Sequence, residues 1–240
     1  MSRPPTYRGA LPGPLAAVRR RTLLAWQTRP APATVQMGGF DLLFEAGLPD
    51  PRPVLGFSMA AFLLDGLAVR AGERLLDLAT GAGLTALWAG RIGAEVVAVD
   101  RGEAAARCLR RSSLIAGLGE PDVRIGGLDA VAGEQFDVIT WLPPLVLEER
   151  SVVTNVLNAA PSLLRRGGRL VLPFADRDGV PWLHDAFAAA GLRFSAVRYA
   201  DAPVLGPVRL YRAWPARHGP PGEVAAGDAL SGTAWVLKDR

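Results

Sequence analysis

The residues with the clearest chemical potential lie in one short stretch of the chain, from Asp77 to Gly83. The apolar run around Asp77 is typical of a strand that a parallel sheet buries on both faces. Gly81 and Gly83 allow tight backbone dihedrals and the close approach of a ligand. A helix beginning at Leu84 would direct its free N–H groups at that ligand. Strand, glycine turn and helix together predict a ligand-binding turn.

Asp77 indicates which kind of ligand this turn takes. A pyrophosphate-binding turn of the G-x-G-x-x-G type begins with glycine where this chain carries Asp77-Leu78-Ala79, and it has little use for a carboxylate there. A carboxylate at the end of a strand suits a cationic or amine-bearing ligand instead. The alternative is an ordinary strand-to-helix turn, because short glycine patterns also occur by chance.

Two further carboxylates follow neighbouring predicted strands. Asp100 ends the apolar strand of residues 95–100. It can accept hydrogen bonds from both ribose hydroxyls of an adenosine-containing cofactor, or it caps the helix that follows. Asp129 follows a strand at residues 123–125 and is either a ligand contact or a turn residue. Open α/β sheets bind ligands at this edge, where the strands end.

The D-x-A-x-G-x-G pattern of residues 77–83 resembles the first motif of class I S-adenosylmethionine-dependent methyltransferases. The resemblance implies S-adenosylmethionine as the cofactor, with its methionine part against this loop. It also implies that Leu128 and Asp129 contact the adenine. The residues that we expect to bind the cofactor are Phe57, Ser58, Asp77, Ala79, Thr80, Gly81, Gly83, Asp100, Arg101, Leu128 and Asp129.

A fourth strand, residues 136–141, runs into Leu142-Pro143-Pro144-Leu145. This is similar to the N-P-P-Y motif of the amino-methylating branch, which includes the enzymes that modify glutamine in release factors; the similarity covers residues 35–175. Leu142 stands where that branch has asparagine, and leucine cannot accept a hydrogen bond from an amine. We therefore expect an apolar acceptor pocket. Alternatively, the prolines only end the strand and Trp141 belongs to the core.

The expected acceptor site consists of Trp141, Leu142 and Pro143. Methyl transfer from a sulfonium needs little covalent help, because in-line positioning supplies much of the rate. A hydroxyl acceptor would benefit from a base, for which His184 is the histidine candidate, although a lone helical histidine is more often structural. Weaker candidates at the same edge are Asp176, Asp178, Asp201, Glu148 and Glu149.

The alternation of apolar strands with helices predicts an α/β fold, Rossmann-like, with a seven-stranded, mostly parallel sheet and helices on both faces. Residues 1–72 form an N-terminal extension or cap with a helix at 14–27, a hairpin around Gly38-Gly39 and a helix at 58–69. Residues 73–215 form the cofactor-binding domain. Residues 216–240 form a tail, in which 233–237 either add an edge strand or stay loose.

The composition also bears on whether the protein enters a membrane, is secreted, forms a disulfide or binds a metal. No apolar run reaches the ~20 residues that cross a bilayer, and the first residues lack the apolar core of a secretory signal, so we expect a cytoplasmic protein with no membrane partner. Cys108 is the one cysteine beside two histidines, so we expect neither a disulfide nor a metal. A homodimer stays open.

The net charge of +4 comes from residues 1–72, which hold eight arginines against four acids. These excess arginines either contact nucleic acid or lie on the solvated face of a helix. We favour the second reading, because strong binders make ~6–10 phosphate contacts.

The sequence thus predicts a methyltransferase for a small-molecule acceptor in secondary metabolism. Four alternatives stay open. The same fold can transfer the aminocarboxypropyl chain or cyclise the cofactor, or the chain can methylate RNA or protein through a helix carrying Arg19-Arg20-Arg21. It can also be a nicotinamide dehydrogenase, or a protein that binds the cofactor without catalysis.

Overall fold

The computed structural model describes residues 34–45, 48–53, 57–143, 150–175, 180–202 and 205–218. Several predicted features lie outside these residues: the helix at 14–27 with its arginines, the edge strand at 233–237, and the candidate residues Pro144, Leu145, Glu148, Glu149, Asp176 and Asp178.

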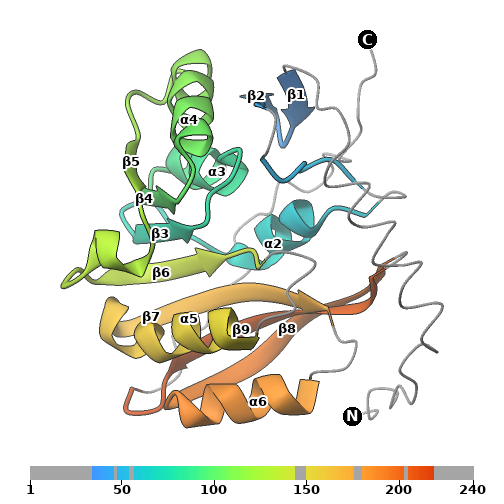
Figure 1. Cartoon of the computed structure of the whole chain (residues 1–240), viewed down its shortest axis with the longest axis vertical. Helices are drawn as coiled ribbons and strands as arrows, with labels where there is room; N and C mark the ends of the chain where they lie inside the picture. The colour runs from blue at the N-terminus through green and yellow to red at the C-terminus, as the bar shows by residue number, and fades with distance from the viewer. Residues whose placement is uncertain are drawn as a thin grey trace.

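The core of the fold is a seven-stranded sheet with the order β5-β4-β3-β6-β7-β9-β8 (Figure 1). The strands from β5 to β7 run parallel, and β9 pairs antiparallel with both β7 and β8. This confirms the predicted fold. The strands are β3 (Arg74–Leu78), β4 (Glu95–Asp100), β5 (Asp122–Ile125), β6 (Phe136–Trp141), β7 (Leu164–Ala175), β8 (Leu192–Ala202) and β9 (Gly206–Pro215).

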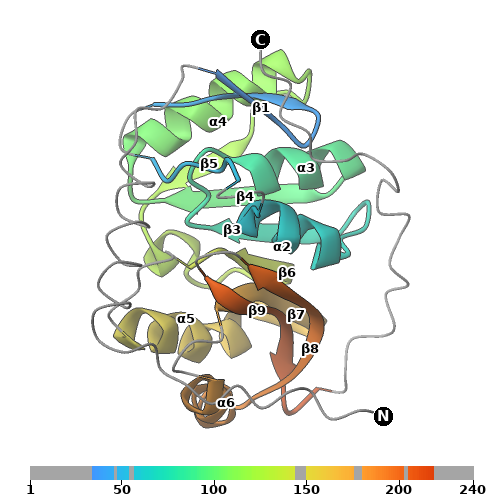
Figure 2. The same ribbon diagram turned by 90° about the vertical axis from the view of Figure 1, so that its right-hand side faces the viewer.

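Helices cover both faces of the sheet and divide the core into two clusters (Figures 1 and 2). One face packs against α2 (Met59–Leu67), α3 (Leu84–Ile92) and α4 (Glu103–Ile115). The other packs against α5 (Arg150–Leu163) and α6 (Val180–Ala189), next to a short 3-10 turn, η1 (Leu128–Val131). Within the described residues, the helices are too short or too polar to cross a membrane.

A separate hairpin, β1 (Thr34–Met37) and β2 (Phe40–Leu43), lies on α3 and α4. Its turn residues Gly38 and Gly39 both have positive φ, at 61° and 76°, as a two-residue hairpin turn requires. Ser112 Oγ accepts the Leu43 N–H at 2.8 Å, and the guanidinium carbon of Arg91 lies 3.5 Å from the Phe40 ring centroid. The hairpin therefore shares the core of the sheet domain; a boundary at residue 72 stays a prediction.

The largest difference from the sequence reading is the junction between α5 and β7. The sequence predicts a helix over residues 151–164 that ends in a basic, glycine-rich cap at residues 165–168. In the structure, β7 already begins at Leu164, which pairs with Phe136. The register then shifts before Arg169 pairs with Val138. Backbone pairing with β6 thus replaces the helix cap. Gly168 is needed there, because a Cβ would lie 2.9 Å from the Phe136 carbonyl oxygen and 3.0 Å from that of Arg165.

We predict that Gly168→Ala lowers the stability of the protein by about 1–3 kcal/mol, because the neighbouring carbonyls belong to the backbone and cannot rotate away. Gly90→Ala is the matched control: the Cβ would meet Leu118 at an ordinary 3.8 Å, and alanine favours the helix by ~1 kcal/mol. Thermal unfolding of both variants measures this. A Gly168→Ala variant as stable as the wild type would contradict the tight approach.

Candidate functional site

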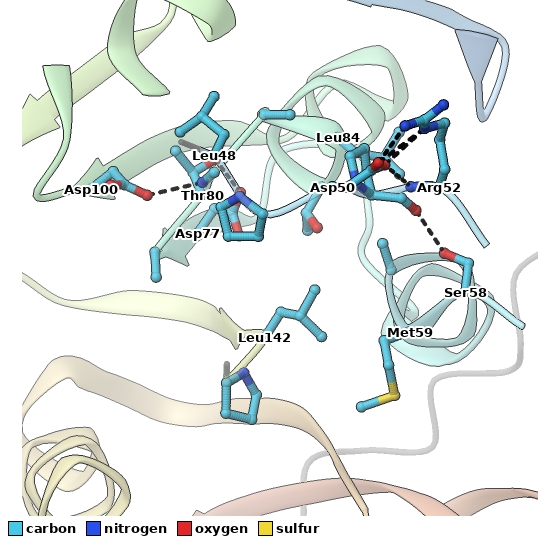
Figure 3. A pocket seen from close by; sticks show the side chains of 18 of the residues that line it. Leu48, Asp50, Arg52, Ser58, Met59, Asp77, Thr80, Leu84, Asp100 and Leu142 are labelled. Carbon is cyan, nitrogen blue, oxygen red and sulfur yellow. Dashed lines mark hydrogen bonds and ion pairs between the residues drawn. The ribbon is translucent and has the colours of Figure 1, made fainter. Parts of the chain in front are cut away.

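A cavity of about 410 Å³ opens at the carboxyl ends of β3, β4 and β6 (Figure 3). Its walls come from the loop at residues 48–52, the start of α2, the turn after β3, the end of β4 and the residues after β6. Nine residues predicted to bind cofactor or acceptor line it: Phe57, Ser58, Asp77, Ala79, Thr80, Gly81, Asp100, Leu142 and Pro143.

Asp77 holds the turn to the sheet. Its side chain is buried, and its carboxylate accepts hydrogen bonds from Thr80 Oγ1 at 2.6 Å and Thr140 Oγ1 at 3.0 Å. Burial raises the pKa of Asp77 to about 6, although these hydroxyls and the backbone N–H of Ala86 favour the charged form. One carboxylate thus connects β3, the glycine turn, the start of α3 and β6.

The glycines of the turn have different roles. Gly81 has φ +57° and lines the cavity, and a Cβ there would meet no atom within 4 Å. Gly83, at φ +85°, precedes α3 and lies outside the cavity. A Cβ at this position would come within 2.6 Å of Leu109 Cδ1. Gly81 therefore leaves room for a ligand, whereas Gly83 lets α3 pack against α4. Ala79 also has a positive φ, 58°, which costs a non-glycine residue about 1–2 kcal/mol.

Asp100 joins the turn to the next strand. One carboxylate oxygen accepts the Gly81 N–H at 2.9 Å, and the other accepts the Gly102 N–H at 2.9 Å. Each carboxylate oxygen has a second lone pair that can accept a ligand hydroxyl, as the ribose hypothesis requires. The capping alternative fits less well, because Gly102 occupies the N-cap position of α4.

The opposite wall is fixed by an ion pair that the sequence reading missed. The buried Asp50 carboxylate accepts hydrogen bonds from the Arg52 backbone N–H at 2.9 Å and from Nε and NH2 at 3.0 and 2.6 Å. Ser58 caps α2 by accepting the Ala61 N–H, and its hydroxyl donates to the Pro51 carbonyl (Figure 3). The local sequence does indicate this contact, since an aspartate two residues before a backbone N–H donor is typical of an Asx turn.

Besides Gly83, three of the expected cofactor contacts lie beside the cavity rather than in its wall: Arg101, Leu128 and Asp129. They remain close to Asp100, because the Gly126 N–H donates to the Asp100 carbonyl at 2.9 Å. Asp129 accepts the Gly127 N–H at 3.0 Å, and Leu128 packs against the core on the α5 side. Their contact with the adenine stays a prediction.

Trp141 and His184, both expected at the acceptor site, do not line the cavity. Trp141 is 2% exposed and packs into the core on the α5 side, while the next residue, Leu142, lines the cavity. Successive residues of a strand point to opposite faces, and this separates the two. His184 Nε2 lies 3.3 Å from Tyr211 Oη and its ring stacks near Phe194. The weaker candidate Asp201 accepts the Tyr199 hydroxyl outside the cavity.

Comparison with known proteins agrees with this geometry. The chain belongs to the methyltransferase small domain family, whose model matches residues 58–189. It is 33% identical over 129 residues to the ubiquinone biosynthesis O-methyltransferase of Xanthomonas euvesicatoria pv. vesicatoria, covering 52% of each chain. It is 32% identical over 127 residues to the enzyme of that name from Stutzerimonas stutzeri, with the same coverage. The chain thus spans about half the length of the curated relatives it matches.

Solved structures show the same fold. The 16S rRNA N2 G1207 methyltransferase of T. thermophilus, in complex with AdoMet and guanosine, superposes with a TM-score of 0.60 at 24% identity, over 77% of this chain and 51% of that one. A putative methyltransferase complexed with SAH, SMU.776, gives 0.58 at 12% identity, over 77% and 57%. The chain thus shares its fold with methyltransferases solved with S-adenosylmethionine (AdoMet) or SAH, in agreement with the family to which it belongs.

The cavity fits this cofactor. The open space beside Gly81 admits a ligand against the backbone. Asp100 offers acceptors to hydroxyls, and Asp77 offers a negative charge to an amine. When bound, S-adenosylmethionine supplies the electrophilic methyl group. The residues around the cavity would hold it, orient it and exclude water.

We predict that Gly81→Val weakens S-adenosylmethionine binding at least tenfold, or about 1.4 kcal/mol, because the side chain would fill the space beside the turn. Gly133→Val is the control, since Gly133 also has a positive φ, 80°, and open space at its Cβ, but lies outside the cavity. Both variants carry similar backbone strain, and titration calorimetry compares their affinities. Equal affinity of the two variants would place the cofactor elsewhere.

We also predict a pH-dependent contribution of Asp77 to stability. Its pKa in the folded protein is about 6, above the ordinary value of 3.8, so between these values the folded state binds more protons than the unfolded state. The contribution of Asp77 to the free energy of unfolding therefore falls as the pH rises from 4 to 7. Urea unfolding across this range should show the Asp77→Asn variant gaining stability relative to the wild type as the pH rises. Parallel pH profiles would contradict the raised pKa.

Proposed function

We propose that the protein methylates a small apolar molecule whose reacting atom lies against Leu142. This residue lines the cavity next to Pro143, where the similar amino-methylating branch has asparagine. Met59, Phe57 and Leu205 face the same space. Such a wall gains free energy by covering apolar ligand surface, at ~25 cal/mol per Å², and offers no acceptor for an amine. Leu142 is the single observation that carries this proposal.

The acceptor must bring its own nucleophilic character. Within the described lining of the cavity, the titratable side chains are Asp50, Arg52, Asp77 and Asp100. Asp50 is paired with Arg52, and the two other carboxylates hold the cofactor turn. A phenol that ionises near neutral pH fits this arrangement, because positioning then suffices for transfer. The names of the curated relatives, O-methyltransferases of ubiquinone biosynthesis, support a small oxygen acceptor. An acceptor from secondary metabolism stays a prediction of the sequence.

The test is an assay of the purified chain with S-adenosylmethionine and a panel of phenols, catechols, amines and short RNAs. Methyl transfer releases S-adenosylhomocysteine and adds one methyl mass to the acceptor. Release of methylthioadenosine would indicate use of the aminocarboxypropyl chain instead. Turnover of RNA but of no small molecule would contradict the proposal, and tight cofactor binding without any turnover would favour a non-catalytic role.

We predict that Leu142→Asn lowers kcat/KM for the best small acceptor at least tenfold, because a polar amide replaces the apolar wall and loses its contact. Leu142→Met, which conserves size and apolar character, should retain activity within a few-fold. The cofactor affinity of both variants is the control and should match the wild type. A Leu142→Asn variant that is faster than the wild type would point to an amine acceptor.

A further inference from the structure

A second group of polar side chains lies on the α2 face of the sheet, at the edge away from the cavity. Arg169 stands where β7 pairs with Val138, early in β6, whereas the cavity lies at the ends of the parallel strands. The register places Arg212 of β9 opposite Val171, two residues along β7. Trp214 follows on the same face of β9, because residues two apart share a face. We call Arg169, Arg212 and Trp214 the β7–β9 cluster.

Arg169 is the anchored member of the cluster. It is 2% exposed, and the Glu73 carboxylate accepts hydrogen bonds from its two terminal nitrogens at 2.8 and 2.9 Å. Its NH2 also donates to the carbonyl of Ala68, just after α2. The charge of Glu73 is therefore already used by Arg169.

The charge of Arg212, unlike that of Arg169, is not balanced by a carboxylate of the described residues. Burial lowers its pKa, and the nearby charge of Arg169 lowers it further. No acidic side chain of the described residues pairs with it. A half-buried cation beside a second cation costs stability unless an anion is present.

The unused donors of the cluster point to the same requirement. Within the part of the chain that the structure describes, Arg169 Nε, Arg212 Nε and Trp214 Nε1 are buried and have no hydrogen-bond partner. Buried donors are normally satisfied, and here three lie on adjacent strands without an acceptor. The pairing of Arg193 with Trp214 and of Ser195 with Arg212 adds an exposed cation and a hydroxyl on the neighbouring strand β8. The α2 face of β9 and β8 therefore gathers hydrogen-bond donors and positive charge in and around the cluster.

We propose that the β7–β9 cluster binds one phosphate group of a small molecule, at a site separate from the methyl-transfer cavity. A phosphate offers several acceptor oxygens and two negative charges, which matches the fork of Arg212, the indole N–H of Trp214 and the adjacent Arg193. The charge of the cluster suits a single phosphate rather than a nucleic-acid backbone, because strong backbone binding needs ~6–10 such contacts. The neighbouring Arg198 is already paired with Asp65.

The test compares thermal unfolding of the full chain in chloride, inorganic phosphate and pyrophosphate at constant ionic strength. The wild type should unfold at least 2 °C higher in phosphate than in chloride. Arg212→Met should be more stable than the wild type in chloride, because an uncompensated cation is removed, and should lose the phosphate shift. Arg212→Lys, which keeps the charge, should retain part of the shift. Arg166→Met is the control, since Arg166 is an exposed arginine of β7, the strand that carries Arg169, and it should shift like the wild type.

Three results would overturn the proposal. Arg212→Met could be less stable than the wild type in chloride, which would assign Arg212 a structural role. All variants could shift equally, which would indicate a general anion effect. In a filter-binding arm with a 20-nucleotide RNA, RNA affinity that depends on Arg212, without a phosphate or pyrophosphate shift, would assign the cluster to nucleic acid instead.

Discussion

The structure depends on the buried carboxylate of Asp77. It lies near the end of β3, accepts hydroxyl hydrogen bonds from the turn and from β6, and accepts the backbone N–H of Ala86 in the first turn of α3. These contacts set where the glycine turn passes over the sheet, and therefore where a cofactor can lie. The arrangement requires an energetically unfavourable buried charge, and the surrounding donors reduce that cost without removing it. The same group is thus a structural tie, and it is also the negative charge that we expect to meet the amine of the cofactor.

The sequence predicts the order and type of the strands and helices because each has a strong local signal. Apolar runs mark the parallel strands, glycines mark the turns, and the Gly38-Gly39 pair marks the hairpin. The same reasoning predicts a group of cavity residues, since strand ends of an open sheet gather at one edge: Asp77, Ala79, Thr80, Gly81, Asp100 and Leu142. The structure of the α5–β7 junction cannot be predicted in this way, because strand pairing between distant residues replaces the local preference for a helix cap.

In a strand that is buried on both faces, it is harder to predict which side chains point to which face of the sheet. β6 is buried on both sides, so no alternation of polar and apolar residues marks its orientation. Trp141 therefore looks as suited to the cavity as Leu142 until the register is known. His184 presents a similar problem, since its aromatic partners Phe194 and Tyr211 come from strands β8 and β9. The Asp50–Arg52 pair, by contrast, can be predicted from the local sequence, because its two residues are only two positions apart.

The outer strand β8 has a consequence for how copies of the chain meet. It carries exposed Arg193 and Arg198, and its register shifts between Ala196 and Arg198. Charged side chains and irregular pairing at an open edge oppose the addition of another strand. Two molecules that met along β8 would bring like charges together on a poorly matched ladder. Self-association by continuing the sheet is therefore disfavoured at this edge, and any homodimer would have to form through a different surface.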